Sequence, residues 1–319
     1  MQRTERSWPW QLLLAAILLA AAAGLWVATD RMDYTWRWNR VPEYFAYRSE
    51  TLQKVPFDGV VEEVREKGDR VEVAVRSPEG ERRTLAVEAG TVRVLPGDDL
   101  FEGDPVGSTF SWRAGPLARG LWVTIWLSFA SGCLGLVLGL VAGLCRVSRN
   151  PALRGLSTVY VEIIRGTPLL VQIFIFYFFI GTVLHLDRIV AGIGALAVFA
   201  GAYVAEIIRA GIQSIPRGQM EAARSLGMSV PQAMTHIILP QAFKRTLPPL
   251  AGQFISLVKD SSLVSVIAIT DLTKSGREVI TSTFATFEVW FTVAALYLLV
   301  TSVLSQLIQW TERRLAVSD

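Results

Sequence analysis

The chain has 319 residues, of which 51% are hydrophobic and 18% charged, and its formal net charge is +3. This composition is typical of a membrane protein with several spans. Both cysteines fall inside one apolar segment, no G-x-x-x-x-G-K-[ST] loop occurs, and no His/Cys/carboxylate cluster has metal-ligand spacing. These absences exclude a disulfide framework, a metal site and a nucleotide-binding site of the common type, so we expect no catalytic residues and no cofactor on this chain.

Residues 1–30 are predicted to form an N-terminal transmembrane anchor. Arg3 and Arg6 precede an apolar run from Trp10 to Ala28, and about 20 such residues are enough to span a bilayer. A cleaved signal peptide is the alternative, because the small residues 21–24 could provide a cleavage site. Its apolar region would be only about 7–15 residues long, however, so we favour a retained anchor.

Residues 31–115 have a different pattern and predict an aromatic segment followed by a small β-domain over about 55–106. The aromatic side chains suit a membrane–water boundary; they are Tyr34, Trp36, Trp38, Tyr44, Phe45 and Tyr47. Valines alternate with polar residues over 71–76, residues 77–80 form a turn, and alternation resumes over 85–87 and 92–94. We interpret this domain as a spacer or docking module. Two segments, FDGVV and PGDDLFEGDPVG, resemble the half-barrel of lipoyl and biotinyl carrier domains, but the Met-Lys-Met attachment lysine is missing.

Residues 116–319 alternate between apolar segments and basic loops, which predicts a five-helix core. The predicted spans are 121–144, 159–184, 189–212, 248–269 and 287–308. In the first of them, Gly135, Gly139 and Gly143 place small residues on one face for close helix packing. The loop 270–288 is expected between the last two spans.

Two E-I-I-R quartets place charges near the ends of predicted spans. Glu162 and Arg165 open the second core span, and Glu206 and Arg209 close the third. Each Glu can pair with the Arg three residues later, or the pairs can cross between spans. Because an unpaired charge deep in a bilayer costs about 2.5–3.5 kcal/mol or more, we hypothesise a buried network that acts as an inner gate. Static packing at helix ends is the alternative.

The segment Gly166-Thr167-Pro168 predicts a kink or an unwound turn in the second core span, because Pro168 removes a backbone hydrogen bond. Gln172 lies one turn further along and is a candidate substrate-binding residue. A purely structural kink is the alternative.

Residues 214–240 form a polar, helix-forming segment between apolar blocks. Gly227 suits a left-handed helix end, and Ser229 with Gln232 forms a capping box that starts a second short helix. That second helix is expected to stop at Pro240. A DNA-binding helix-turn-helix is an alternative, but residues 230–238 contain no Lys or Arg to contact a phosphate backbone.

This segment resembles the EAA loop of permease subunits of bacterial ABC importers. The matching positions, at the family's spacing, are Glu221, Ala222, Ala223, Gly227, Leu239 and Pro240. The resemblance implies that residues 216–240 are coupling helices that dock on a separate ATPase, which binds ATP and Mg. It also implies a second permease protomer, an extracytoplasmic solute-binding protein and, because residues 117–316 resemble polar amino-acid permeases, an amino-acid substrate.

The motif Lys259-Asp260-Ser261 lies near the middle of a predicted span and resembles a motif of the same family. Neighbouring residues on a helix point about 100° apart, so we expect at least Asp260 to face a wet cavity. There Asp260 could bind the α-ammonium of an amino acid, while Ser261, Ser262 or a helix end binds its carboxylate. A structural Lys–Asp pair is the alternative.

Basic loops fall on one side of the membrane if both termini are cytoplasmic, which places the β-domain outside and the coupling segment inside. We therefore expect an all-α, multi-pass protein of the bacterial inner membrane with about six transmembrane helices and an extracytoplasmic β-domain after the first. Its predicted function is the import of polar amino acids by alternating access, without nucleic acid and without enzymatic activity of its own. A membrane-anchored regulator or scaffold and an ion-driven transporter are the alternatives.

Overall fold

The computed structural model describes residues 8–31 and 34–316, and the chain divides into two units, residues 1–40 and 41–319. In the first unit, helix α1 (Trp8–Asp30) is apolar and long enough to cross a bilayer, as predicted. The aromatic residues after it pack ring against ring, with the Trp36 and Trp38 ring centroids 5.7 Å apart. Arg3 and Arg6 lie outside the described residues.

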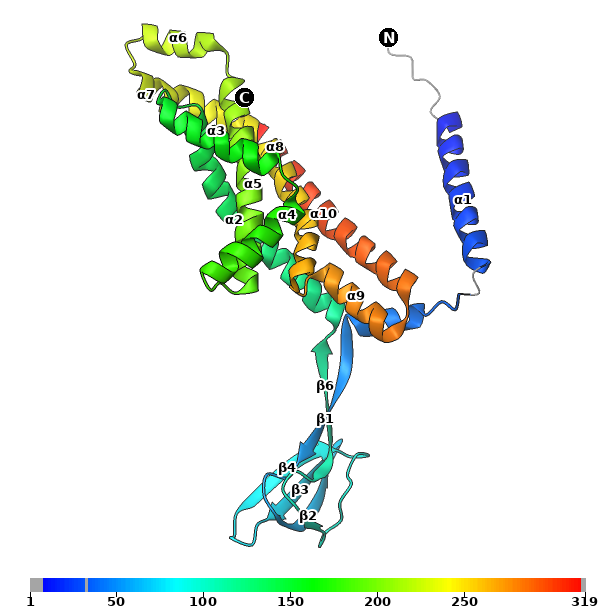
Figure 1. Ribbon diagram of the computed structural model, residues 1–319. Helices are drawn as coiled ribbons and strands as arrows, with labels where there is room; N and C mark the ends of the chain where they lie inside the picture. The colour runs from blue at the N-terminus through cyan, green and yellow to red at the C-terminus, as the bar shows by residue number, and fades with distance from the viewer. Residues whose placement is uncertain (1–7, 32–33, 317–319) are drawn as a thin grey trace. The chain divides into compact units, whose positions relative to one another are not determined.

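The second unit begins with a β-domain built from six antiparallel strands (Figure 1). A two-stranded ribbon pairs β1 (Ala46–Lys54) with β6 (Pro105–Ala114). A four-stranded sheet has the order β4-β3-β2-β5, with bounds Arg82–Glu88, Arg70–Arg76, Gly59–Lys67 and Asp99–Leu100. The predicted strands over 71–76 and 85–87 are present with Val71, Val73, Val75 and Val87 buried, but the alternation is incomplete because Ala74 is buried as well. The sequence pattern missed the ribbon, and residues 92–94, expected as a strand, are irregular.

Two turns of the β-domain, six residues apart in the sequence, have the same hydrogen-bonding pattern. In the first, the Leu95 backbone N–H donates to the Asp98 carboxylate at 2.8 Å; in the second, the Phe101 N–H donates to Asp104 at 2.9 Å. Gly97 and Gly103 have φ angles of +96° and +94°, which an L side chain rarely adopts. These rigid turns hold two apolar side chains in solvent, Leu95 at 70% exposure and Phe101 at 68%.

The β-domain is joined tightly to the helical core. The Gly115 N–H donates to the Phe45 carbonyl at 2.7 Å, and a Cβ at Gly115 would overlap the backbone of Tyr44. Tyr44 is buried in one apolar cluster with Leu117, Leu272 and Val289. The close approach fixes the base of the ribbon to the helices that carry these residues: α2 (Pro116–Arg146), α9 (Leu272–Thr283) and α10 (Thr286–Ala316).

The centre of the helical core is the packing of α2 against α5 (Arg188–Gln213). Gly135, Gly139 and Gly143 lie on the buried face of α2, and a Cβ at Gly139 would overlap Val204 of α5. The predicted small-residue face is therefore confirmed, since only a glycine lets the two backbones come this close.

The second core span is not one continuous helix. The region predicted as a single span over 159–184 is divided into α3 (Pro151–Arg165) and a second piece made of α4 (Leu169–Phe174) and a π-helical turn, η2 (Ile175–Gly181). The pieces are bent by 105° at a break of three residues. Pro168 is extended, with ψ at 137°, so it cannot continue α3. The expected kink is confirmed, but it separates two helices.

The remaining core helices follow the coupling segment. Helix α8 (Leu239–Asp260) tightens into a 3₁₀ turn, η4 (Ser261–Ile267), and α9 and α10 complete the core. The prediction of a loop over 270–288 is wrong for its middle part. Helix α9 (Leu272–Thr283) occupies that part, and the Asp271 carboxylate caps its N-terminus. Among the described residues, five helices are long and apolar enough to cross a membrane, and the bent pair makes a sixth. This agrees with the predicted fold of about six spans.

Candidate functional site

The coupling segment is a rigid pair of short helices joined at a glycine. Helix α6 (Arg217–Ser225) ends in a Schellman motif, in which the Met228 N–H donates to the Ala223 carbonyl and the Gly227 N–H donates to the Arg224 carbonyl. Gly227 has a φ of +84°, which confirms the predicted left-handed end. Helix α7 (Val230–Ala233) then starts with the predicted capping box of Ser229 and Gln232.

The second coupling helix does not stop at Pro240, contrary to the prediction. It passes through a π-helical turn, η3 (Met234–Ile238), straight into α8. Pro240 lies in the first turn of α8 and lacks the N–H that an α-helix would use. The wider π turn just before it is where the hydrogen-bond ladder changes, so the helix continues past the proline. The coupling segment is thus continuous with a spanning helix.

The motif residues divide between a buried and an exposed face. Ala223 is buried, and an apolar cluster holds the segment to the core through Ile215, Ile238 and the end of α5. Glu221 and Ala222 are exposed, Leu239 is half-buried and Pro240 is exposed. Leu226 is 85% exposed and lies beside a shallow depression of about 340 Å³ that reaches Gln232 and His236. The exposed leucine and this depression therefore lie on the outer face of the coupling segment, away from the apolar cluster that holds it to the core.

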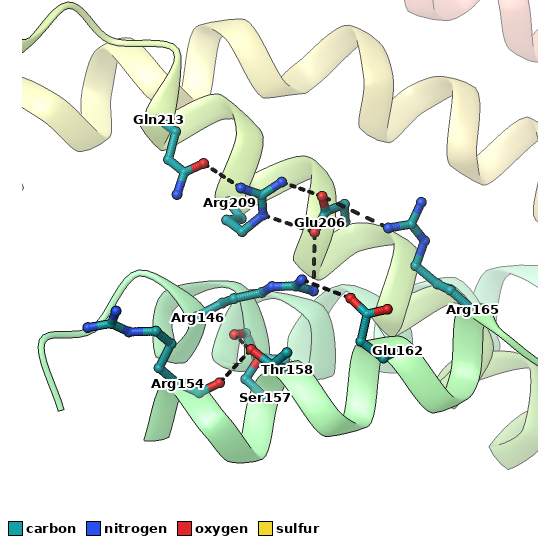
Figure 2. Close-up of polar contacts among 10 residues, drawn as sticks. Arg146, Arg154, Ser157, Thr158, Glu162, Arg165, Glu206, Arg209 and Gln213 are labelled. Atoms are coloured by element: carbon teal, nitrogen blue, oxygen red, sulfur yellow. Dashed lines mark hydrogen bonds and ion pairs between the residues drawn. The ribbon is translucent and has the colours of Figure 1, made fainter. Parts of the chain in front are cut away.

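Four charged residues predicted as a gate network are joined by a fifth, Arg146 of α2 (Figure 2). Glu206 is the centre: Arg209 binds both of its carboxylate oxygens, the Arg146 Nη1 lies 3.2 Å from Oε2, and the Arg165 Nη1 lies 3.9 Å from Oε1. Arg146 also lies 3.3 Å from the Glu162 carboxylate. The network therefore links α2, α3 and α5. Both kinds of pairing that the sequence allows are present, because Glu206 pairs with Arg209 within α5 and with Arg165 of α3.

The network is part-buried on one side and open on the other. The Arg146 side chain is 14% exposed and that of Glu206 is 24%, while that of Glu162 is 68% exposed. Three arginines face two carboxylates, so the group carries an excess of one positive charge. Arg165 also lies over the Tyr203 ring, 5.3 Å from its centroid. Glu206 is the one carboxylate shared by all three arginines, which makes it the residue most able to break the assembly.

The candidate substrate-binding residues lie at two helix discontinuities that meet in the core, since α4 contacts η4. Lys259 is exposed and Asp260 is half-buried at the end of α8. Ser261 is fully buried, and its Oγ donates to the Val258 carbonyl at 2.7 Å. The hydroxyl of Ser261 is therefore already engaged, whereas the Asp260 carboxylate has no hydrogen-bond donor among the contacts of the described residues.

Gln172 has a structural task at the break between α3 and α4. Its Nε2 donates to the carbonyl of Ile164 at 2.7 Å and to the carbonyl and hydroxyl of Thr167 at 3.1 and 2.9 Å. These bonds satisfy acceptors freed where Pro168 ends the α-helical ladder. The Oε1 of Gln172 is buried without a hydrogen-bond partner among the described residues, so it is the one polar atom of this side chain that is not engaged at the break.

Sequence reasoning missed two polar groups. The first predicted core span ends at residue 144, so the sequence places Arg146 in the basic loop that follows, whereas the structure has it as the last residue of α2. The second group lies where α9 begins. Asp271 is buried and accepts from the N–H groups of Thr273 and Lys274, and the Tyr297 hydroxyl donates to it at 3.4 Å. Burial raises the pKa of Asp271 above its ordinary value, against the opposing effect of these hydrogen bonds.

Comparisons with known proteins assign the helical core. The family model described as "Binding-protein-dependent transport system inner membrane component" matches residues 135–317. The glutamine transport system permease protein GlnP of Escherichia coli (strain K12) is 39% identical over 210 residues, which are 65% of this chain and 96% of that protein. The probable glutamine ABC transporter permease protein GlnM of Bacillus subtilis (strain 168) is 44% identical over 200 residues, 62% of this chain and 93% of that protein.

A solved structure agrees. A crystal structure of an amino acid ABC transporter with histidines is 41% identical, superposes with a TM-score of 0.59 and covers 62% of this chain and 94% of that chain. The relatives are thus covered almost completely, while residues 1–134, which include α1 and the β-domain, lie outside the family model. The chain belongs to the family of binding-protein-dependent transport system inner membrane components, the multi-pass permease subunits of ABC importers.

Proposed function

We propose that this chain is the permease subunit of an ABC importer that carries polar amino acids. The observation that supports this most is the exposed, rigid coupling segment on a chain whose relatives are glutamine permeases. The chain has no P-loop motif, so the energy source is a partner ATPase that holds ATP and Mg. Two permease protomers, two ATPase subunits and an extracytoplasmic solute-binding protein form the working transporter.

The ATPase docks on the exposed face of the coupling segment. The contact is made by Glu221, Ala222 and Leu226. The Schellman and capping-box hydrogen bonds hold the two helices at a fixed angle, so the segment moves as one unit when the ATPase moves. Because α7 continues into α8, movement of the docked ATPase reaches the residues at the far end of α8, Lys259 and Asp260, along one helix.

The coupling segment and both termini are cytoplasmic in this proposal. Basic residues favour the cytoplasmic side, and Arg146, Arg149, Arg154, Arg217 and Arg245 all lie at the end of the core that carries α6 and α7. The β-domain then faces the outside, where the solute-binding protein arrives.

Asp260 is the proposed partner of the substrate ammonium group. A zwitterion that leaves water needs a partner for each charge, and a half-buried carboxylate at a helix break can supply one of them. Ser261 already bonds the backbone, so the substrate carboxylate is assigned to Lys259 or to the adjoining helix end, and Gln172 contributes through Oε1. The Glu162, Arg165, Glu206 and Arg209 network closes the cytoplasmic side until ATPase movement separates α3 from α5.

The test is ATP hydrolysis by the reconstituted full complex, stimulated by the binding protein loaded with each member of an amino-acid panel. We expect stimulation by one or a few polar amino acids. When the complex is purified through the permease, we expect Leu226→Glu to abolish co-purification of the ATPase. Leu95→Glu, the same substitution at another exposed leucine, serves as the matched control and leaves ATPase binding intact. If Leu226→Glu retains the ATPase at wild-type stoichiometry, this coupling surface is wrong.

A further inference from the structure

A groove of about 340 Å³ lies between α2, α3 and α5, close to the end of α2 that packs against the coupling segment. One wall is a helical stripe of α2 that includes Val137, Val141 and Cys145. The facing wall is the stripe of α3 formed by Leu153, Leu156 and Tyr160. Several of these side chains face outward, with Val141 59% and Leu156 73% exposed, so the groove opens away from the helical core.

The polar atoms that line this groove are already bonded inside the protein. The Ser157 hydroxyl donates to the Ala142 carbonyl at 2.6 Å, and the Tyr160 hydroxyl donates to the Val198 carbonyl at 2.7 Å. What remains for a ligand is a hydrocarbon surface. The wall from Val137 to Cys145 rises about 12 Å along α2, close to the roughly 15 Å depth of one bilayer leaflet. The groove therefore matches an acyl chain in length and in chemistry.

One end of the groove is strongly positive. The loop that joins its two walls and the first turn of α3 carry Arg146, Arg149 and Arg154, and no acidic residue occurs from 146 to 161. Arg146 is engaged by Glu162 and Glu206. Arg149 is exposed, and Arg154 donates from Nε to the Ser148 carbonyl at 3.3 Å, which holds its guanidinium beside this loop. The N-terminal end of the 15-residue α3 adds its partial positive charge.

We propose that this groove binds an anionic phospholipid, with an acyl chain between α2 and α3 and the phosphate at Arg149 and Arg154. An anionic headgroup fits because two exposed arginines and a helix N-terminus lie at the loop end of the groove, in a stretch, 146–161, that has no acidic residue. The site rests on the membrane assignment of the family and not on the amino-acid substrate. A lipid seated there bridges the two helices whose ends carry Arg146 and Glu162, so it stabilises the charged network at their junction.

The test uses the full-length chain, purified and delipidated, and native mass spectrometry with phosphatidylglycerol or phosphatidylcholine of identical acyl chains. We expect preferential retention of phosphatidylglycerol. The double variant Arg149→Gln/Arg154→Gln weakens phosphatidylglycerol binding roughly 25-fold, about fivefold per arginine, and leaves phosphatidylcholine binding unchanged. The matched control Arg113→Gln/Arg188→Gln removes two exposed arginines elsewhere and keeps wild-type lipid preference.

A groove-filling variant separates the acyl chain from the charges. Val141→Trp fills the groove from its rim and abolishes retention, whereas Leu140→Trp, at a neighbouring exposed position of α2 outside the lining, retains the lipid. Equal binding of the two lipids, or an unchanged preference in Arg149→Gln/Arg154→Gln, overturns the proposal. So does a Val141→Trp variant that keeps its lipid and loses the pairing of protomers, because the groove then holds a second copy of this chain.

Discussion

Replacing Glu206 with glutamine tests whether the charged network is a cytoplasmic gate. The substitution keeps the shape of the side chain and removes the one carboxylate shared by Arg146, Arg165 and Arg209. Glu162 then remains as the only acidic member of the network, and its side chain is 68% exposed. Three guanidinium groups drawn to one point lose their common counter-charge, so the arrangement that joins α3 to α5 is weakened.

The size of the effect follows from distance and burial. At 3.2 Å and an effective dielectric constant of about 20, the Arg146–Glu206 attraction alone is about 5 kcal/mol before desolvation is subtracted. A buried pair broken on one side costs roughly 3–5 kcal/mol and an exposed pair roughly 0–1 kcal/mol. With side-chain exposures of 14% and 24%, this pair lies between these limits, and we take about 2 kcal/mol. That is about a 30-fold shift in a gate equilibrium.

The assay compares ATP hydrolysis and substrate uptake by the full transporter in proteoliposomes. We expect Glu206→Gln to raise hydrolysis in the absence of binding protein and to lower the amount of substrate carried per ATP. Glu162→Gln is the comparison within the same network: because the Glu162 side chain is 68% exposed, we expect a change of at most about fivefold, well below that of Glu206→Gln. In a double-mutant cycle, Arg146→Gln should recover part of the loss. Unchanged coupling in Glu206→Gln, with the complex intact, would refute the gate.

Three other substitutions give separate tests. Gly227→Ala forces an alanine into a φ of +84°, which should destabilise the turn by about 1 kcal/mol and reduce ATPase binding. Wild-type ATPase binding by this variant would show that docking does not depend on the conformation of the turn. Asp260→Asn should abolish substrate-stimulated hydrolysis while basal hydrolysis persists, and normal stimulation would remove Asp260 from the substrate site. Burial raises the pKa of Asp271 in the folded protein, so its charge is destabilising above that pKa and acidification towards the ordinary carboxyl range relieves the cost; Asp271→Asn should therefore gain less unfolding temperature on acidification than the wild type. The same rise in both proteins would contradict the assignment, and Asp271→Ala should lose a further ~1 kcal/mol as the cap of α9 disappears.

The features that the sequence predicted correctly are those specified by short local sequence motifs. The capping box of Ser229 and Gln232 and the left-handed Gly227 each depend on residues a few positions apart, and so do the glycine face of α2 and the buried valines of β3. A local pattern specifies such a feature before any tertiary contact forms.

The features that were missed depend on contacts between distant segments. The ribbon pairs Ala46 with Ala114, and the sequence of β1 alternates too weakly to predict a strand without that partner. Arg146 reaches Glu206 only because glycines bring α2 against α5. Pro240 predicts a helix end because a proline usually ends a helix, but a π turn before it lets the helix continue. Helix α9 has only 12 residues and few apolar ones, so its composition looked like a loop despite the cap at Asp271.

The positions of rigid and broken helices suggest how movement passes through the core. Helices α2 and α5 are continuous and pack closely through glycines. Neither helix can slide along the other without overlap of their atoms, so together they form a fixed frame. The breaks lie elsewhere: between α3 and α4, at η3, and between α8 and η4. Helix α5 enters the coupling segment directly at its C-terminal end, and Gly211 brings it against Thr246 of α8 so closely that a Cβ would overlap that side chain. A displacement of α6 and α7 is therefore anchored by α5 and passes into α8 through the π turn that precedes it. We accordingly expect a large residue at Gly211 to separate α5 from α8 and to uncouple hydrolysis from uptake, even though Gly211 touches neither the ATPase surface nor the substrate candidates.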